Sequence, residues 1–125
     1  MIFDTDVLIW VERKRHSADL LVDSFEQRYI STQTYLELLQ YAKNKDHVAK
    51  SKGYLKDLGF KVLPITEEIS HRAMVYIEEY GLSHGLDAGD ALIAATAVEH
   101  GLTLATANEK HFRAIKDLKL KVFKP

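Results

Sequence analysis

Three carboxylates and one amide lie where a fold could bring them together to do chemistry. Asp4 follows an apolar opening segment, and Asp90 opens an apolar helix. Glu37 is a lone acid within an apolar and aromatic helical stretch, and Asn108 follows a short apolar strand. Oxygen donors without cysteine or a histidine pair favour a hard cation, Mg²⁺ or Mn²⁺, over zinc. Such an ion lowers the pKa of a bound water and neutralises charge on a phosphate, so a phosphodiester is the natural substrate.

These acids would repel one another strongly if nothing joined them. Two carboxylates about 4 Å apart repel by roughly 4 kcal/mol at an effective dielectric near 20. A whole domain is held together by only about 5–15 kcal/mol. A cluster of three is therefore tolerable only with a shared cation or with bound protons. Taken singly, Asp4 and Asn108 are most often caps or turn residues and Glu37 a partly exposed helix residue, so the argument depends on all of them meeting.

The elements that must position these side chains alternate between strand and helix along the chain. The hydrophobic spacing predicts short strands near residues 1–3, 29–31, 61–65, 102–106 and 121–123. Between them it predicts helices near residues 7–11, 20–25, 32–42, 46–58, 66–81, 90–100 and 109–115. This alternation predicts a parallel sheet covered by helices on both faces. Sites in such sheets form at the carboxyl ends of the strands, where Asp4 and Asn108 would lie.

Length and composition predict one ordinary domain. The chain has 125 residues, of which 46% are hydrophobic and 28% charged, so we expect a single domain over residues 1–125. It contains no cysteine, which excludes a disulfide framework and a thiolate nucleophile. The N-terminal stretch is unlike a signal peptide, and no apolar run reaches the roughly 20 residues that cross a bilayer. We therefore expect a soluble, cytoplasmic domain with no membrane partner.

The formal net charge of −1 conceals a segregation of charge. Six lysines lie between residues 43 and 61, and six Lys or Arg between 110 and 124, while residues 67–90 hold six acids. Single runs of this kind are usually solvated helix faces. They could also contact a polyanion, because phosphate contacts need local rather than net charge.

Four motifs together resemble the PIN-domain ribonucleases, and among them the VapC-type toxins of toxin–antitoxin pairs. The resemblance extends over essentially the whole chain, and the third and fourth motifs are the specific ones. The motifs are Asp4-Thr5 after the first strand, Ser31-Thr32 followed by Glu37-Leu-Leu, Asp90-Ala-Leu-Ile-Ala-Ala-Thr-Ala, and Leu104-Ala-Thr followed by Asn108 and Phe112.

The resemblance implies a three-layer α/β/α PIN-like domain with a central parallel sheet of about four or five strands. It implies that Asp4, Glu37 and Asp90 bind Mg²⁺ or Mn²⁺, with Asn108 in the fourth catalytic position and Thr106 as the small hydroxyl residue beside it. It also implies an RNA substrate, a cognate antitoxin protein and a homodimer. One departure is His111, because the family commonly has an acid at this position.

Two further acids and two rival functions remain open. Asp6 could cap the first helix or lie behind the metal ligands, and Asp87 could cap the helix of Asp90 or contact a second ion. The opening Asp4-x-Asp6 also resembles the haloacid-dehalogenase phosphatases, although the acids that this family carries after a later strand are missing. The other alternative is a module that binds RNA without cutting it, with the acids holding a structural ion.

Overall fold

The computed structural model describes residues 1–125, and a five-stranded sheet with the order β3-β2-β1-β4-β5 lies at its centre. Every neighbouring pair of strands is parallel. The predicted parallel sheet is thus confirmed, with five short strands. These are β1 (Ile2–Phe3), β2 (Tyr29–Ser31), β3 (Lys61–Leu63), β4 (Leu104–Thr106) and β5 (Leu120–Val122).

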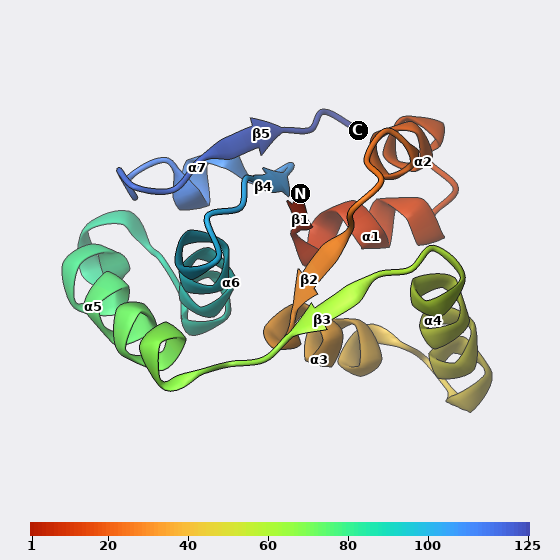
Figure 1. Cartoon of the computed structure of the whole chain (residues 1–125), viewed down its shortest axis with the longest axis horizontal. Coiled ribbons are helices and arrows are strands. Elements are labelled where there is room, and N and C mark those ends of the chain that lie inside the picture. The colour runs from red at the N-terminus through yellow and green to blue at the C-terminus, as the bar shows by residue number, and fades with distance from the viewer.

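Helices cover both faces of this sheet, so the molecule has three layers. Figure 1 shows α5 and α6 on one side of the sheet and α1 to α4 on the other. This is the α/β/α arrangement expected from the sequence. The helices are α1 (Thr5–Glu12), α2 (His16–Asp23), α3 (Thr32–Tyr41), α4 (Lys45–Asp57), α5 (Glu67–His84), α6 (Ala88–Glu99) and α7 (Glu109–Phe112).

The sheet separates two apolar cores, because successive side chains of a strand point to opposite faces. Ile2 and Leu104 pack into the core beneath α5 and α6. Their neighbours Phe3 and Ala105 pack into the core beneath α1 to α4. All four are completely buried. The strands that carry Asp4 and Thr106 to the edge of the sheet are therefore fixed from both sides.

Several helix ends differ from the prediction for local reasons. Helix α6 begins at Ala88 rather than at Asp90, because Asp87 caps it by accepting a hydrogen bond of 2.8 Å from the Asp90 N–H. Helix α5 continues past residue 81 to His84 and ends at Gly85, whose φ of +67° suits glycine. Helix α2 starts at His16 and has no side-chain cap, so the predicted start further along the chain was wrong.

No helix has the length and apolar character needed to cross a membrane.

Candidate functional site

A hollow of about 420 Å³ lies beyond the carboxyl ends of β1 and β4, bordered by α1, α3, α6 and α7. The structure brings the dispersed candidate residues together there. Thr106 lies completely buried beside them at the end of β4. The lining includes all four predicted residues and both secondary acids: Asp4, Glu37, Asp90 and Asn108, with Asp6 and Asp87.

Asp4 is the most deeply buried of these acids, with 5% of its surface exposed. It caps α1 by accepting a hydrogen bond of 2.8 Å from the Thr5 N–H, and the Thr106 hydroxyl donates to its other oxygen at 2.7 Å. Burial, together with the nearby charges of Asp6 and Asp90, raises the pKa of Asp4 to about 8. These two hydrogen bonds oppose the rise but do not outweigh it. At neutral pH the carboxyl therefore holds a proton unless a cation replaces it.

Glu37 reaches the hollow from α3 and is half-buried. The Thr5 hydroxyl donates to its Oε1, and the Gln33 side-chain amide donates to Oε2 at 3.1 Å. Helix α6 approaches this carboxylate closely at Gly89, where an added Cβ would lie 2.8 Å from Oε2. The position of Glu37 therefore depends on the absence of a side chain at residue 89.

Asp90 is the third residue of α6, in the helix's first turn. Burial, with a smaller contribution from the charge of Asp87, raises its pKa to about 6. His111 acts in the opposite direction, since its Nδ1 lies 3.4 Å from Asp90 Oδ2. His111 thus also lines the hollow.

Asp6 and Asn108 tie the first helix to the segment after β4. Asp6 Oδ2 accepts a hydrogen bond of 3.1 Å from the Ala107 N–H, and Asp4 is the residue that caps α1. Of the two roles expected of Asp6, capping the first helix is therefore wrong, and a place behind the metal ligands stays a prediction. Asp6 Oδ1 is buried and has no hydrogen-bond partner. The Asn108 N–H donates to the Thr106 hydroxyl at 2.9 Å, while its side chain caps no helix and lines the hollow.

The chemistry of this donor set fits a hard divalent cation. Burial is the largest cause of the raised pKa values of Asp4, Asp6 and Asp90, and a nearby positive charge would relieve it. The unpartnered Asp6 Oδ1 points to the same need. No three Asp, Glu or His side chains already stand close enough to hold one ion together. The half-buried Glu37 would have to turn toward the others to share one.

Sequence reasoning missed the residues that hold the acids in place. Thr5 stands next to Asp4 in the first motif, yet only the fold shows that its hydroxyl serves Glu37 from another helix. Gln33 precedes Glu37 by four residues, a helical spacing that would have identified this pair. Asp87 caps α6, which is one of the two roles expected of it, and contact with a second ion stays a prediction.

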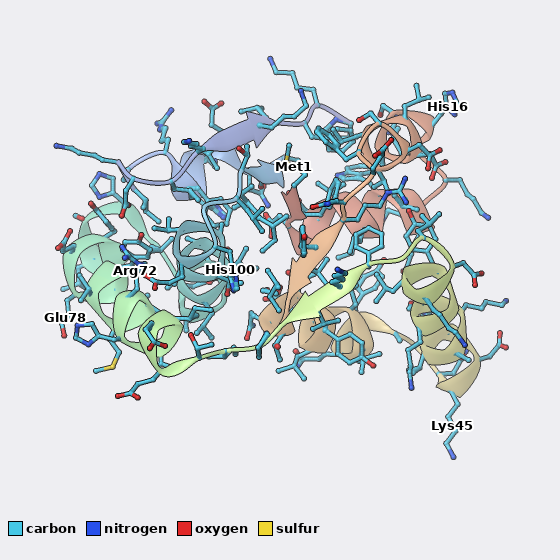
Figure 2. All side chains as sticks on the ribbon, viewed as in Figure 1. Met1, His16, Lys45, Arg72, Glu78 and His100 are labelled. Carbon is cyan, nitrogen blue, oxygen red and sulfur yellow. The ribbon has the colours of Figure 1, made fainter.

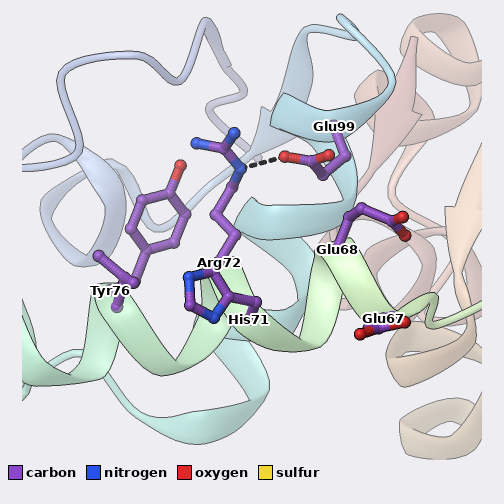
Figure 3. A pocket seen from close by; sticks show the side chains of 7 residues that line it. Glu67, Glu68, His71, Arg72, Tyr76 and Glu99 are labelled. Atoms are coloured by element: carbon purple, nitrogen blue, oxygen red, sulfur yellow. Dashed lines mark hydrogen bonds and ion pairs between the residues drawn. The ribbon is translucent and has the colours of Figure 1, made fainter.

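A second hollow, of about 550 Å³, lies along α5. Its chemistry differs from that of the hollow at the sheet edge, which we call the acidic hollow. Figure 3 shows Arg72 there beside Glu99, with which it makes an ion pair. Arg72 also pairs with Asp117 at 3.0 Å, and the Tyr76 hydroxyl donates to the same carboxylate at 3.1 Å. Its one guanidinium is thus neutralised within the chain. The acids with raised pKa values line the hollow at the sheet edge instead.

Comparison with known proteins identifies the family of the chain. Residues 1–118 match the profile of the PIN domain family. A curated relative named Ribonuclease VapC1, from Rickettsia felis, is 33% identical over 96% of this chain and 93% of its own length. Ribonuclease VapC10 of Mycobacterium tuberculosis is 46% identical over 48% of this chain and 46% of its own length.

Solved structures show the same fold. A chain of a toxin–antitoxin complex from Klebsiella pneumoniae superposes with a TM-score of 0.80 at 30% identity, covering 94% of this chain and 93% of its own. A chain of VapBC2 from Rickettsia felis, bound to a DNA fragment of its promoter, gives a TM-score of 0.83 over 99% of this chain and 100% of its own. The identity in the second case is 19%, so that likeness concerns the fold alone.

Proposed function

Because the chain belongs to the PIN domain family, we propose that it is an endoribonuclease and the toxin of a type II toxin–antitoxin pair. The observation that carries the proposal is the meeting of Asp4, Glu37, Asp90 and Asn108 in one hollow at the edge of the sheet. The resemblance of the chain's motifs to those of PIN-domain ribonucleases implies the same four residues. Residues 1–125 then act as a single domain, and the reaction takes place in the cytoplasm.

The reaction depends on Mg²⁺ or Mn²⁺. Asp4, Glu37 and Asp90 are the ligands, and Asn108 is a weaker ligand or positions the phosphate. The raised pKa values of Asp4 and Asp90 and the all-oxygen donor set support this assignment. When bound, the ion supplies a water of lowered pKa and neutralises charge that develops on the phosphate.

The residues around the acids hold them in the orientation that RNA cleavage requires. The Thr106 hydroxyl accepts from the Asn108 N–H and donates to Asp4, so one small side chain aligns two of the site's residues. The Thr5 hydroxyl does the same for Glu37 from α1. Asp6 keeps the segment after β4 against α1 and stands behind the three ligands. Removing the Thr5 or the Thr106 hydroxyl should loosen the site without removing an acid.

The haloacid-dehalogenase alternative has lost its support. The PIN domain profile matches residues 1–118, so the opening Asp-x-Asp pattern needs no other explanation. Asp6 also lies within α1, where the Ala107 N–H occupies one of its oxygens.

An antitoxin protein is the expected partner, because the Klebsiella relative is a toxin–antitoxin complex. We also infer a homodimer, on the family resemblance alone.

The test is cleavage of labelled RNA by purified protein with Mn²⁺, with Mg²⁺ and with EDTA. Asp90→Asn should lower the cleavage rate by at least about 100-fold, as removing a central electrostatic group does elsewhere. Asp57→Asn is the matched control, since Asp57 is exposed on α4 and makes no ion pair. Cleavage that persists in EDTA refutes the metal-dependent nuclease. RNA that binds but stays intact in both metals identifies a binding module instead.

A further inference from the structure

A cluster of cations lies at the junction of α1 and α2, outside the acidic hollow. It surrounds an open hollow of about 530 Å³. Figure 2 shows His16, which also lines this hollow, at the outer corner of the molecule at the start of α2. No ion pair with a carboxylate involves any of the four Lys and Arg side chains. We call this surface the basic corner and define it by Trp10, Arg13, Lys14, Arg15, Ser17 and Lys124.

An aromatic ring holds the two guanidinium groups of the basic corner. The guanidinium carbon of Arg13 lies 5.5 Å from the centre of the Trp10 ring, and that of Arg15 lies 5.1 Å from it. Stacking of this kind restrains long side chains and leaves their N–H groups at the edge of the plane free. Neither guanidinium makes a hydrogen bond within the chain. Two restrained guanidinium groups with unused N–H donors suit a phosphate group, because a phosphate accepts paired hydrogen bonds.

The backbone between the two helices has an unusual conformation that presents these cations. Lys14 has a φ of +64° and is the only residue other than glycine with a positive φ. Glycine or asparagine adopts this conformation more readily than lysine. Strained residues of this kind concentrate at sites where function requires a particular side chain. A charged side chain therefore occupies a position where a stability argument favours glycine.

The start of α2 adds polar groups that lack a partner inside the chain. Arg15 is the N-cap residue, and its side chain makes no capping hydrogen bond. Ser17 lines the hollow, and its hydroxyl oxygen is buried without a hydrogen-bond partner. The first N–H groups of a helix and the positive end of its dipole attract anions. This unpartnered hydroxyl is a second observation at the same hollow, independent of the cations.

We propose that the basic corner binds a backbone phosphate of the same RNA strand whose scissile bond lies in the acidic hollow. This inference rests on the proposed ribonuclease function. Asp6, Ile9 and Arg13 follow one another at helical spacing along one side of α1, so a single helix face connects the two hollows. The eight residues of α1 span about 12 Å, a distance that a short RNA segment covers.

The chemistry of the basic corner favours RNA over an acidic peptide. Trp10 is the only hydrophobic residue that lines this hollow, and the two guanidinium groups lie over its ring. A peptide would therefore find charge but no apolar pocket for its side chains. Phosphates along a strand need only spaced cations and free donors, which this surface has.

The experiment measures binding of a fluorescent 12-nucleotide RNA to the full chain in EDTA, over a range of salt concentrations. Arg13→Ala/Arg15→Ala should raise Kd about tenfold at low salt and reduce the salt dependence by about one or two counterions. The control Lys52→Ala/Lys56→Ala removes the same charge from exposed, unpaired positions of α4 and should change Kd less than twofold. An equal loss in the control overturns the proposal, because net charge then explains it.

A second variant separates binding from folding. Lys14→Gly should raise Tm by a few degrees, because glycine accepts the positive φ, and should still weaken RNA binding. Unchanged RNA affinity in both basic-corner variants overturns the proposal, as does a larger loss of affinity for a glutamate-rich peptide than for RNA. Binding in EDTA needs no cleavage, and the Mn²⁺-induced rise in Tm reports on the acidic hollow alone. Failure here with intact cleavage would therefore leave the ribonuclease function standing.

Discussion

Replacing Asp4 by asparagine should stabilise the metal-free protein while removing its response to a divalent cation. The Asp4 carboxyl has an ordinary pKa of 3.8, and burial raises this to about 8 in the folded chain. At pH 7 the unfolded state is ionised while the folded state holds a proton, which weighs against folding by roughly 4 kcal/mol at most. Part of the rise in pKa comes from repulsion by Asp6 and Asp90. We therefore expect Asp4→Asn to increase the free energy of unfolding at pH 7 by about 2–4 kcal/mol.

The sign also fixes the pH dependence. Because the pKa of Asp4 is raised in the folded state, the contribution of this group to stability is fully present below pH 4 and is lost progressively as pH rises toward 8. In EDTA, the Tm of the wild-type chain should therefore fall over this range more steeply than that of the variant. The gain at pH 7 corresponds to a rise in Tm of roughly 8–15 °C for a chain of this size.

Thermal unfolding in EDTA and in millimolar Mn²⁺ measures both effects. Mn²⁺ should raise the Tm of the wild-type chain, by about 2.7 kcal/mol in free energy at a concentration 100 times its Kd, and leave Asp4→Asn nearly unchanged. Asp57→Asn, at an exposed position, is the control for loss of one charge. A variant that is less stable than wild type in EDTA at pH 7, or a wild-type Tm indifferent to Mn²⁺, refutes the reasoning.

Three further substitutions test individual contacts. Gly89→Ala places a Cβ 2.8 Å from Glu37 Oε2, so we expect RNA cleavage in Mn²⁺ to fall at least about tenfold with Tm nearly unchanged; an unaltered rate would contradict the assigned role of this close approach. Thr106→Val removes the hydroxyl that donates to Asp4 and should lower stability to urea by about 1–3 kcal/mol, and an unchanged midpoint would argue against the contact. Gly85→Ala strains a φ of +67° and should lower Tm by a few degrees without altering the Mn²⁺ response.

The fold could be predicted because its signals are local. Alternating strand and helix patterns determine a parallel sheet, and the opposite facing of Ile2 and Phe3 follows from the two-residue period of a strand. The end of α5 was predicted too early because Gly81 resembles a terminus, while the glycine with the positive φ is Gly85.

The gathering of the candidate acids was predictable, but the contacts that orient them were not. Asp4 follows a strand and Asp90 lies in the first turn of a helix, and both facts depend on short stretches of sequence. The position of the Glu37 carboxylate depends on how closely α3 approaches α6 at Gly89. This approach is determined by the packing of the three layers and not by local sequence. The start of α6 was misplaced because Asp87 and Asp90 are both acceptable caps, and Asp87 is the one that is used.

The acidic hollow spans the seam between the two halves of the molecule. Glu37 comes from the α1 to α4 layer and Asp90 from the α5 and α6 layer, and the sheet keeps the cores of these layers apart. An ion shared by these two acids would fasten one half to the other at the rim. Amide hydrogen exchange in α3 and α6 should then slow together when Mn²⁺ is added, whereas an ion seated within one layer would protect that layer alone.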